Sequence, residues 1–339
     1  MLLSIVVPVY NEVEVLPSLL AAIRGAMAGT PHGYELILVD DGSVDGTTDA
    51  FKQAAAADPH IKALFFSRNF GHQAAITAGL DFASGDAAVV IDADLQDPPE
   101  LFPEMIALLQ QGYDVVSAQR LTRSGDGIVK RYTAAMFYWI IRKTVDKRIQ
   151  PEVGDFRMFS RRAVVALRQL REQHRFMRGM VAWLGLKEAI LPYHRKPRLA
   201  GTTKYPMWKM LRFAWTAISS FSALPLRLSV FFGLFVAGCG FCYAGYSVFA
   251  ALVLKETVPG WTSLVVLNII FSGASLIAIG LVGEYVSRIY EEAKGRPLYV
   301  ISDSANVRVS GPHIAKAVIL PPGEPEAEYE QATRKANRL

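Results

Sequence analysis

The sequence predicts an α/β domain with a mostly parallel sheet, followed by two membrane-spanning helices towards the C-terminal end. Over the first two-thirds of the chain, short β-branched and apolar runs alternate with segments of helical periodicity. That alternation is typical of parallel strands joined by helices that cover both faces of the sheet. Two uncharged apolar segments follow, and each is long enough to cross a bilayer.

Four apolar runs are expected to form the first strands: 4–9, 34–40, 61–67 and 86–92. Each run is bounded by polar or turn residues and has the length of a strand rather than of a helix. In open sheets of this kind, ligands bind beyond the carboxyl ends of the strands. Polar residues at those ends are therefore the candidate binding residues.

Three of the four strand ends carry polar motifs. The first strand leads into Tyr10, Asn11 and Glu12, the second into "DDGSVDGT" at 40–47, and the fourth into "DADLQD" at 92–97. Taken alone, 40–47 is equally well explained by a turn followed by a helix cap. The segment 92–97 taken alone has a solvated acidic loop as its less favoured alternative. Their occurrence together at one edge of one sheet indicates a ligand site.

The acids at 92–97 predict a divalent cation site. Mg²⁺ and Mn²⁺ prefer oxygen ligands and are usually held by one or two carboxylates together with substrate phosphates. Asp92 and Asp94 both reach such an ion from a strand end, and Gln96 adds a neutral oxygen. Neither GxxxxGK[ST] nor GxGxxG occurs in the sequence, so a P-loop NTPase or a dinucleotide site is not indicated. A nucleotide sugar is the expected source of the diphosphate.

Two segments, at about 228–254 and 261–283, are predicted to form a transmembrane hairpin. Both are uncharged, and a six-residue loop separates them. Basic residues flank the pair on its outer sides, whereas the connecting loop carries one Lys. The positive-inside rule then places the α/β domain and both termini in the cytoplasm, with the hairpin crossing the membrane.

Composition and cysteine placement exclude other classes. The net charge of +5 is explained by contact with anionic lipid, and because no zinc-finger or RNP pattern occurs, no nucleic-acid partner is expected. Cys239 and Cys242 lie within the first apolar segment with no His beside them, so both are expected to pack as small apolar residues. Residues 130–148 and 204–221 place aromatic groups between basic ones and are expected to lie at the membrane surface. For 130–148 the alternative is an ordinary core helix.

Five motifs follow one another along the chain: "VVPVYNE", "LVDDGSVDGT", "SRNFGHQAAITAGLDFASGD", "IDADLQDPPE" and "GDFRMFSRRAV". Together they resemble the family 2 glycosyltransferases of the GT-A fold. More narrowly, they resemble the polyprenyl-phosphate glycosyltransferases, a group that includes dolichyl-phosphate mannose synthase and the GtrB-type glucosyl transferases. The resemblance continues through the two apolar helices. The QxxRW signature of processive polymer synthases does not occur in the sequence, which argues against a cellulose or chitin synthase type.

The resemblance implies a metal-dependent, inverting transfer of one sugar onto a polyprenyl phosphate such as undecaprenyl phosphate. UDP-glucose is the expected donor, and the alternatives are GDP-mannose, UDP-N-acetylhexosamine and UDP-aminoarabinose. A non-catalytic membrane scaffold that recruits a flippase is the alternative from another class. The metal ligands are expected to be Asp92, Asp94 and Gln96, with Mg²⁺ or Mn²⁺ as the ion. The implied nucleotide-sugar pocket consists of Pro8, Tyr10, Asn11, Glu12, Asp40, Asp41 and Asp92.

The resemblance also places Asp155 near the reacting centre, with Asp94 as the second catalytic residue. Because a phosphomonoester is already largely ionised at neutral pH, Asp155 either acts as a base or only orients the acceptor. Basic partners for the acceptor phosphate are expected at Arg120 and Arg131, and at two positions that match the family, Arg198 and Lys204.

The expected domain organisation has four parts: a catalytic domain at 1–203, an interfacial helix at 204–227, two transmembrane helices within 228–287, and a C-terminal hairpin and tail at 288–339. In bacterial relatives a comparable C-terminal strand joins a neighbouring subunit. By that analogy a homo-oligomer, a tetramer, is expected.

Overall fold

The computed structural model describes residues 1–121, 153–194, 224–254, 260–307 and 317–319. The chain forms two compact units. One contains the N-terminal part together with the residues from Arg296 onward, and the other contains the two long apolar helices. The expected interfacial segments at 130–148 and 204–221 lie outside the described residues.

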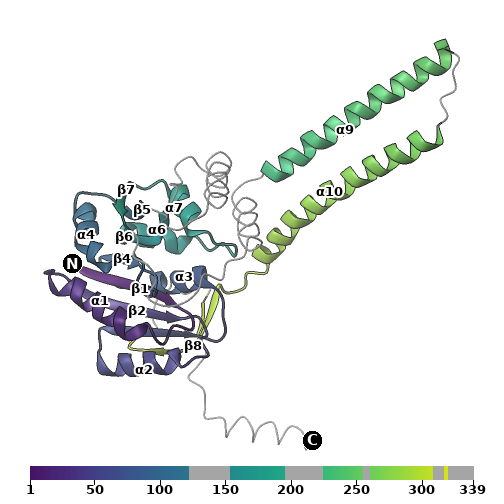
Figure 1. Ribbon diagram of the computed structural model, residues 1–339. Coiled ribbons are helices and arrows are strands. Elements are labelled where there is room, and N and C mark those ends of the chain that lie inside the picture. Colours follow the sequence, from purple (N-terminus) through teal and green to yellow (C-terminus); the bar gives the residue numbers. More distant parts are fainter. Residues whose placement is uncertain (122–152, 195–223, 255–259, 308–316, 320–339) are drawn as a thin grey trace, which may run out of the picture. The chain divides into compact units, whose positions relative to one another are not determined.

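The first unit is built on a single mixed sheet (Figure 1). In the described part of the chain the spatial order of its strands is β7-β5-β6-β4-β1-β2-β3-β8-β9. Strands β1 to β4 run parallel, whereas β6 runs antiparallel to its neighbours β4 and β5. The four strands predicted from the sequence are confirmed. The bounds are β1 Leu2–Val9, β2 Gly33–Asp40, β3 Ile61–Phe66, β4 Ala87–Val90, β5 Val115–Arg120, β6 Val153–Ser160 and β7 Glu188–Tyr193.

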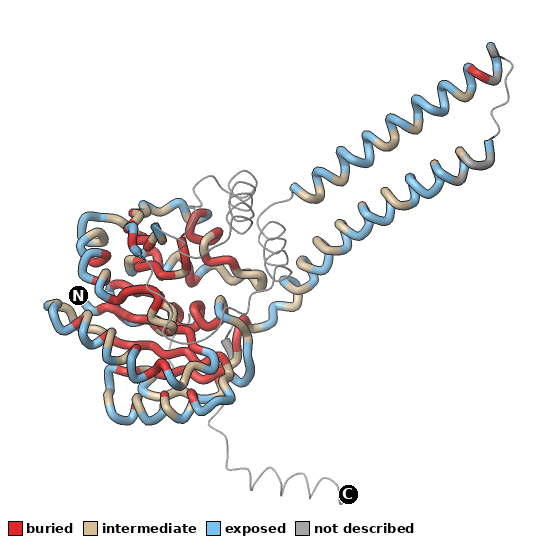
Figure 2. The backbone as a smooth tube through the Cα atoms, in the orientation of Figure 1, coloured by how far each residue is buried: buried red, intermediate tan, exposed pale blue. Residues whose placement is uncertain are grey.

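Helices cover both faces of this sheet, and the strands between them are buried (Figure 2). On one face lie α1 (Leu16–Ala28), α2 (Thr47–Ala57) and α4 (Phe102–Gln110), which follows the 3-10 turn Pro99–Leu101. On the other lie α3 (His72–Phe82), α6 (Arg161–Gln169) and α7 (Met177–Leu184). In α1 the buried residues recur every three or four positions, at Leu16, Leu19, Ile23 and Met27. Such spacing gives a helix one apolar face to bury.

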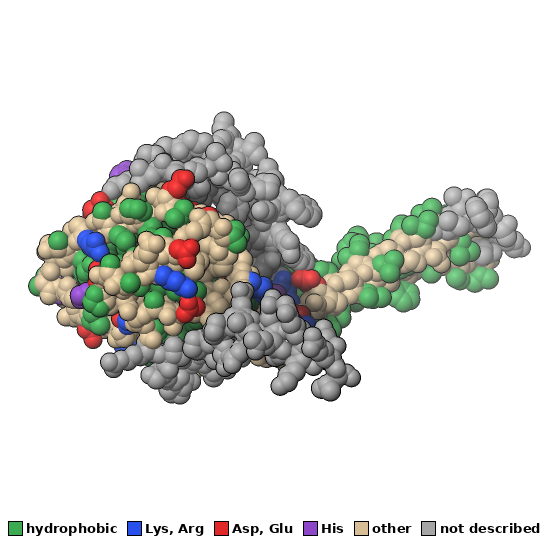
Figure 3. Space-filling view, turned by 90° about the horizontal axis from the view of Figure 1, so that it is seen from below, with side chains coloured by type: hydrophobic (Ala, Val, Ile, Leu, Met, Phe, Trp, Pro, Cys, Tyr) green, Lys and Arg blue, Asp and Glu red, His purple; other side chains and the backbone are tan. Residues whose placement is uncertain are grey.

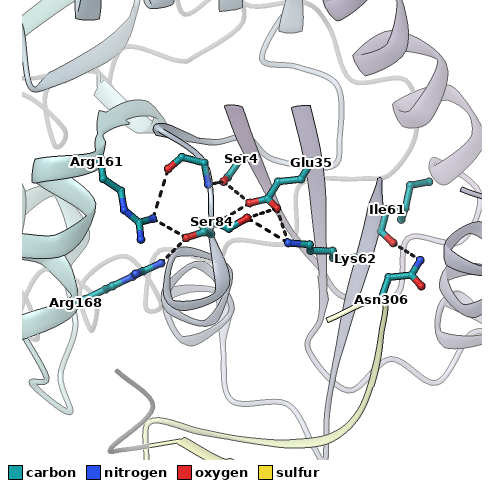
Figure 4. Close-up of polar contacts among 10 residues, drawn as sticks. Ser4, Glu35, Ile61, Lys62, Ser84, Arg161, Arg168 and Asn306 are labelled. Atoms are coloured by element: carbon teal, nitrogen blue, oxygen red, sulfur yellow. Dashed lines mark hydrogen bonds and ion pairs between the residues drawn. The ribbon is translucent and has the colours of Figure 1, made fainter. Parts of the chain in front are cut away.

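A buried polar cluster ties together the amino ends of β1, β2 and β3 (Figure 4). Glu35 Oε1 accepts hydrogen bonds from Ser4 Oγ at 2.5 Å and from the Ser84 amide at 2.7 Å. Its Oε2 accepts from Lys62 Nζ at 2.5 Å and from Ser84 Oγ at 2.6 Å. Burial raises the pKa of Glu35, but the hydrogen bonds from Lys62, Ser4 and Ser84 outweigh it and leave the pKa below its ordinary value. The cluster therefore stabilises the end of the sheet opposite the polar motifs.

The strand after the apolar helices completes this sheet. β8 (Tyr299–Ala305) pairs antiparallel with β3, and β9 (Ala317–Ile319) runs parallel to β8. The short hairpin expected in this region stays a prediction, because residues 308–316 lie outside the described part of the chain. Within the described part, β8 pairs with β3, whose edge offers both backbone partners and an apolar surface. Tyr299 is fully buried there, stacks on Phe66 at 5.2 Å, and donates a 2.7 Å hydrogen bond to Asp81 of α3.

The second unit consists of α9 (Leu224–Phe249), which continues into the π-helical turn Ala250–Leu254, and α10 (Trp261–Ala293). Hydrophobic side chains lie along the surfaces of both helices (Figure 3). At 26 residues, α9 is about 39 Å long, more than the roughly 30 Å of a hydrocarbon core. Both helices are long and apolar enough to cross a membrane, and they account for membrane association.

Two local features shape this pair of helices. A Cβ atom at Gly240 would lie 2.4 Å from the ring of Phe271, so the two helices approach closely at this glycine. α10 continues to Ala293 rather than ending near residue 283. In its last turns Glu284 and Arg288 form an i,i+4 ion pair at 2.9 Å, a pairing that supports helix.

Candidate active site

The polar motifs meet at one edge of the sheet in the first unit. Strands β1 to β4 are parallel, so the residues that follow each of them emerge at the same edge. β6 begins at this edge because it runs antiparallel to β4. Asp155, near the start of β6, therefore lies beside the acids that follow β4. Gln119, near the end of β5, pairs with Val153 at the start of β6. Arg120, the last residue of β5, therefore lies at the same edge.

The loop after β1 is joined to the loop after β2. Asn11 adopts the left-handed conformation with φ of 55°. Its amide donates to Ser43 Oγ at 2.9 Å, and its side-chain oxygen accepts from the Val44 amide at 2.9 Å. The Glu12 amide donates to Thr47 Oγ1 at 3.2 Å. Asn11 therefore shapes this loop.

The other residues expected in the nucleotide pocket differ in their exposure to solvent. Pro8 is buried inside β1, whereas Tyr10 is 47% exposed at its end. Asp40 and Asp41 are both buried. Asp40 accepts hydrogen bonds from the Ser43 amide at 2.9 Å and from a Thr48 hydroxyl at 2.5 Å.

Asp41 joins the loop after β2 to the loop after β3. Its carboxylate accepts from the amides of Phe70 at 2.7 Å and Gly71 at 3.0 Å. Burial raises the pKa of Asp41 despite these two bonds. The hydrogen bonds of Asp40 and Asp41 fix the two loops at this edge, and nucleotide binding by either carboxylate stays a prediction.

The acids after β4 form a crowded carboxylate cluster. Asp92 and Asp94 are partly exposed, while Gln96 and Asp97 are buried. Burial raises the pKa of Asp92 to about 6, although part of its side chain reaches solvent. The nearby His72 lowers this pKa. The negative charges of the neighbouring acids raise it further; these acids are Asp97, Asp155 and Asp94. Such crowding is relieved by a cation.

The loop holds this cluster in a strained conformation. Leu95 has a φ of 55°, which costs a non-glycine residue about 1 kcal/mol or more. The strain places the Gln96 amide 3.2 Å from Asp94 Oδ1, to which it donates a hydrogen bond. Backbone strain of this kind is concentrated at functional sites.

Asp155 is surrounded by groups that favour its charged form. His72 Nε2 lies 3.3 Å from Asp155 Oδ2, and Gln73 Nε2 donates to the same oxygen at 3.1 Å. Arg178 Nε lies 3.6 Å from Oδ1. Burial raises the pKa of Asp155, but Arg178 and His72 more than offset it and hold that pKa well below the ordinary value. Asp155 is therefore a weak base.

His72 links the two groups of acids. Its Nε2 lies 3.7 Å from Asp92 Oδ1 as well as close to Asp155. Burial lowers the pKa of His72, but the neighbouring Asp155 and Asp92 outweigh it and raise that pKa overall. Gln73 connects Asp155 to α7, because its Oε1 accepts a 3.0 Å hydrogen bond from the amide of Met177 at the start of that helix.

Sequence reasoning missed His72, Gln73 and Arg178. His72 and Gln73 could have been predicted, because they follow the third predicted strand. Ligands bind beyond the carboxyl ends of parallel strands, and that rule applies to this strand as it does to the other three. Arg178 gave no comparable signal, since nothing in the sequence places α7 beside the start of β6.

Of the basic residues expected at the acceptor phosphate, the structure places Arg120 at this edge. Its Nη2 lies 3.5 Å from Asp97 Oδ1, and its Nε donates to the Tyr193 hydroxyl at 3.1 Å. The other three, Arg131, Arg198 and Lys204, lie outside the described residues.

Among the described side chains, no three His, Cys, Asp or Glu residues are grouped so as to hold a metal ion by themselves. Asp92 and Asp94 fit a cation that also takes oxygen ligands from a bound substrate, since both are partly exposed and Asp92 is charge-crowded. This arrangement suits a hard divalent ion.

A mixed sheet with an acidic cluster at its carboxyl edge, covered by helices on both faces, is the GT-A arrangement of a nucleotide-sugar transferase. The chain belongs to glycosyltransferase family 2, whose family model, "Glycosyl transferase family 2", matches residues 4–168. The protein is therefore a glycosyltransferase.

Named relatives match nearly the whole chain. It is 45% identical to the uncharacterized glycosyltransferase YkcC of Bacillus subtilis, over 90% of this chain and 94% of that one. It is 42% identical to the SfII prophage-derived bactoprenol glucosyl transferase of Shigella flexneri, over 90% of this chain and 98% of that one. Among solved structures, mannosyl-3-phosphoglycerate synthase from Rubrobacter xylanophilus aligns with a TM-score of 0.46 at 18% identity, covering 65% of this chain and 73% of that one.

Proposed function

We propose that this chain transfers one glucose from UDP-glucose onto a polyprenyl phosphate at the cytoplasmic face of the bacterial inner membrane. The observation that carries the proposal is the convergence of Asp92, Asp94 and Asp155 at one sheet edge, in a chain that also has two membrane-length helices. The glucosyl donor and the lipid acceptor are supported by the 42% identity to a bactoprenol glucosyl transferase.

The proposed reaction joins an acceptor phosphate oxygen to C1 of the sugar with inversion. The bond between C1 and the donor's β-phosphate oxygen breaks, and UDP leaves with the bonding electron pair. Because the second pKa of a phosphomonoester is about 6, the attacking oxygen is already largely ionised at neutral pH. The low pKa of Asp155 suits a residue that orients the acceptor rather than one that removes a proton.

Asp92 and Asp94 would hold a divalent cation, Mg²⁺ or Mn²⁺, together with the donor diphosphate, and Gln96 stays a predicted third ligand. Such an ion supplies neutralisation of the charge on the departing diphosphate. Asp92 and Asp94 are both partly exposed, which supports a role in facing the donor, and His72 Nε2 lies close to both Asp92 and Asp155.

The test incubates the purified full chain in detergent with undecaprenyl phosphate, Mg²⁺ or Mn²⁺, and radiolabelled UDP-glucose, and counts label in the organic phase. We expect transfer that is lost with EDTA and in Asp94→Ala, while Asp155→Asn keeps its affinity for the donor. Equal loss of donor affinity in both variants would refute this division of roles.

Other outcomes would correct the proposal. Transfer from GDP-mannose, a UDP-N-acetylhexosamine or UDP-aminoarabinose instead of UDP-glucose would keep the reaction and change the sugar. If a nucleotide sugar bound but no donor was consumed, the chain would be a membrane scaffold that recruits a flippase. The tetramer stays a proposal by analogy; in this structure β8 pairs with β3 of its own chain.

A further inference from the structure

Three side chains form a closed polar triangle beside the carboxylate cluster. Asp97 is fully buried and accepts a hydrogen bond from the Tyr193 hydroxyl. Arg120 closes the triangle, because its Nε donates to that hydroxyl at 3.1 Å and its Nη2 lies 3.5 Å from Asp97 Oδ1. The three residues come from the loop after β4 and from the ends of β5 and β7. The triangle therefore joins three strand ends at the site.

Stability alone does not explain Asp97. Its second carboxylate oxygen, Oδ2, is enclosed and has no hydrogen-bond partner in the part of the chain that the structure describes. An enclosed oxygen without a partner is destabilising, and well-packed apolar residues often replace buried charged groups at no cost in stability. A buried polar atom that lacks a protein partner in a native fold calls for an explanation, and a role of Asp97 in holding Arg120 supplies one.

Gly154 shows where the triangle holds the Arg120 guanidinium. A Cβ atom at Gly154 would lie 2.9 Å from Arg120 Nη2 and 3.4 Å from its Cζ, so the guanidinium lies directly over this residue. Gly154 immediately precedes Asp155 in β6. The Arg120 side chain is 22% exposed, so part of it reaches the surface of this unit.

We propose that Asp97 and Tyr193 are positioning residues, which hold the Arg120 guanidinium over Gly154 so that it binds the phosphate of the lipid acceptor next to Asp155. The inference rests on the proposed function, because that function supplies the anionic acceptor. A guanidinium held by two partners loses little freedom when it binds, and its planar fork matches a phosphate group.

The test measures transfer by the full chain over graded concentrations of undecaprenyl phosphate and, separately, of UDP-glucose. Gly154→Ala displaces the guanidinium, and Tyr193→Phe removes the shared hydroxyl while keeping the ring that packs on Phe156. In both we expect KM for the lipid to rise about tenfold, with the KM for UDP-glucose unchanged. The matched controls are Gly25→Ala, where nothing lies within 4 Å of the added Cβ, and Tyr34→Phe; neither should change either constant.

A double-mutant cycle with Arg120→Ala separates positioning from general damage. If Gly154→Ala acts through Arg120, it should have almost no further effect on KM for the lipid in the Arg120→Ala background. The same tenfold effect in that background, or equal losses for lipid and donor, would overturn the inference and leave the proposed function standing. A wild-type chain that transfers no sugar would refute the proposed function, and this inference with it.

Discussion

Replacing Gln73 by Glu tests whether Asp155 depends on the groups around it. In the wild type, Gln73 Nε2 donates to Asp155 Oδ2 at 3.1 Å. The variant places a second carboxylate oxygen at that distance. Two unit charges 3.1 Å apart at an effective dielectric constant of 20 repel by about 5 kcal/mol. The two groups turn apart and share a proton, so we expect a net cost of about 2 to 3 kcal/mol.

We expect this cost to appear in turnover, because it displaces Asp155, the carboxylate that we propose orients the acceptor. It corresponds to a loss of about 30- to 150-fold in kcat. Gln73→Ala removes the hydrogen bond without adding charge, and should lose less. The assay is the initial rate of transfer at saturating substrates, together with the Kd of the donor, which should not change. Gln53→Glu makes the same change on an exposed face of α2 and serves as the control.

The pH dependence of the Gln73→Glu defect gives a second check. The shared proton raises the pKa of the carboxyl pair, so acid pH protonates one member and removes the repulsion. The ratio of wild-type to variant rates should therefore be larger at pH 8 than at pH 6.5. A Gln73→Glu enzyme with wild-type kcat at pH 8 would refute the idea that these contacts hold Asp155 in a productive position.

Three further predictions concern the fold. Gly79→Ala puts a Cβ 2.1 Å from Val6 Cγ1; thermal unfolding in detergent should show a loss of about 1 to 3 kcal/mol, and turnover should fall because α3 shifts. Glu35→Gln should cost about 2 kcal/mol at pH 7. Because the pKa of Glu35 is lowered in the fold, its contribution is present above its ordinary value of 4.5, and the difference from wild type should shrink as the pH falls below 4.5. Tyr299→Phe removes the hydrogen bond to Asp81 and should lower the free energy of unfolding by about 1 kcal/mol. The KM values for the lipid and for UDP-glucose should stay unchanged.

The sequence was most informative where local pattern decides structure. The runs that became β1 to β4 are short, apolar and bounded by turns, so their positions follow from burial and chain geometry. The convergence of Asp92, Asp94 and Asp155 follows in part from the rule that parallel strands present their carboxyl ends together.

Contacts between distant segments were beyond such reasoning. No local pattern says that β8 lies against β3, since the pairing of Phe66 with Ile301 depends on which sheet edge is free. The contact between Arg178 and Asp155 likewise requires the placement of α7. The roles of Asp40, Asp41 and Asn11 in nucleotide binding stay predictions, and the sequence could not show that their side chains hold the neighbouring loops together.

The position of β8 in the chain bears on how the protein is made. Tyr299 and the rest of β8 follow α10, so a ribosome releases this strand only after both apolar helices have been synthesised. Until then the β3 edge is unpaired, and Asp81 on α3 lacks the Tyr299 hydroxyl. Because α3 also carries His72 and Gln73 at its other end, the catalytic unit is completed only after the membrane anchor has emerged. A soluble form truncated before α9 would lack this strand, so a soluble version should instead join residues on either side of the two helices with a short linker.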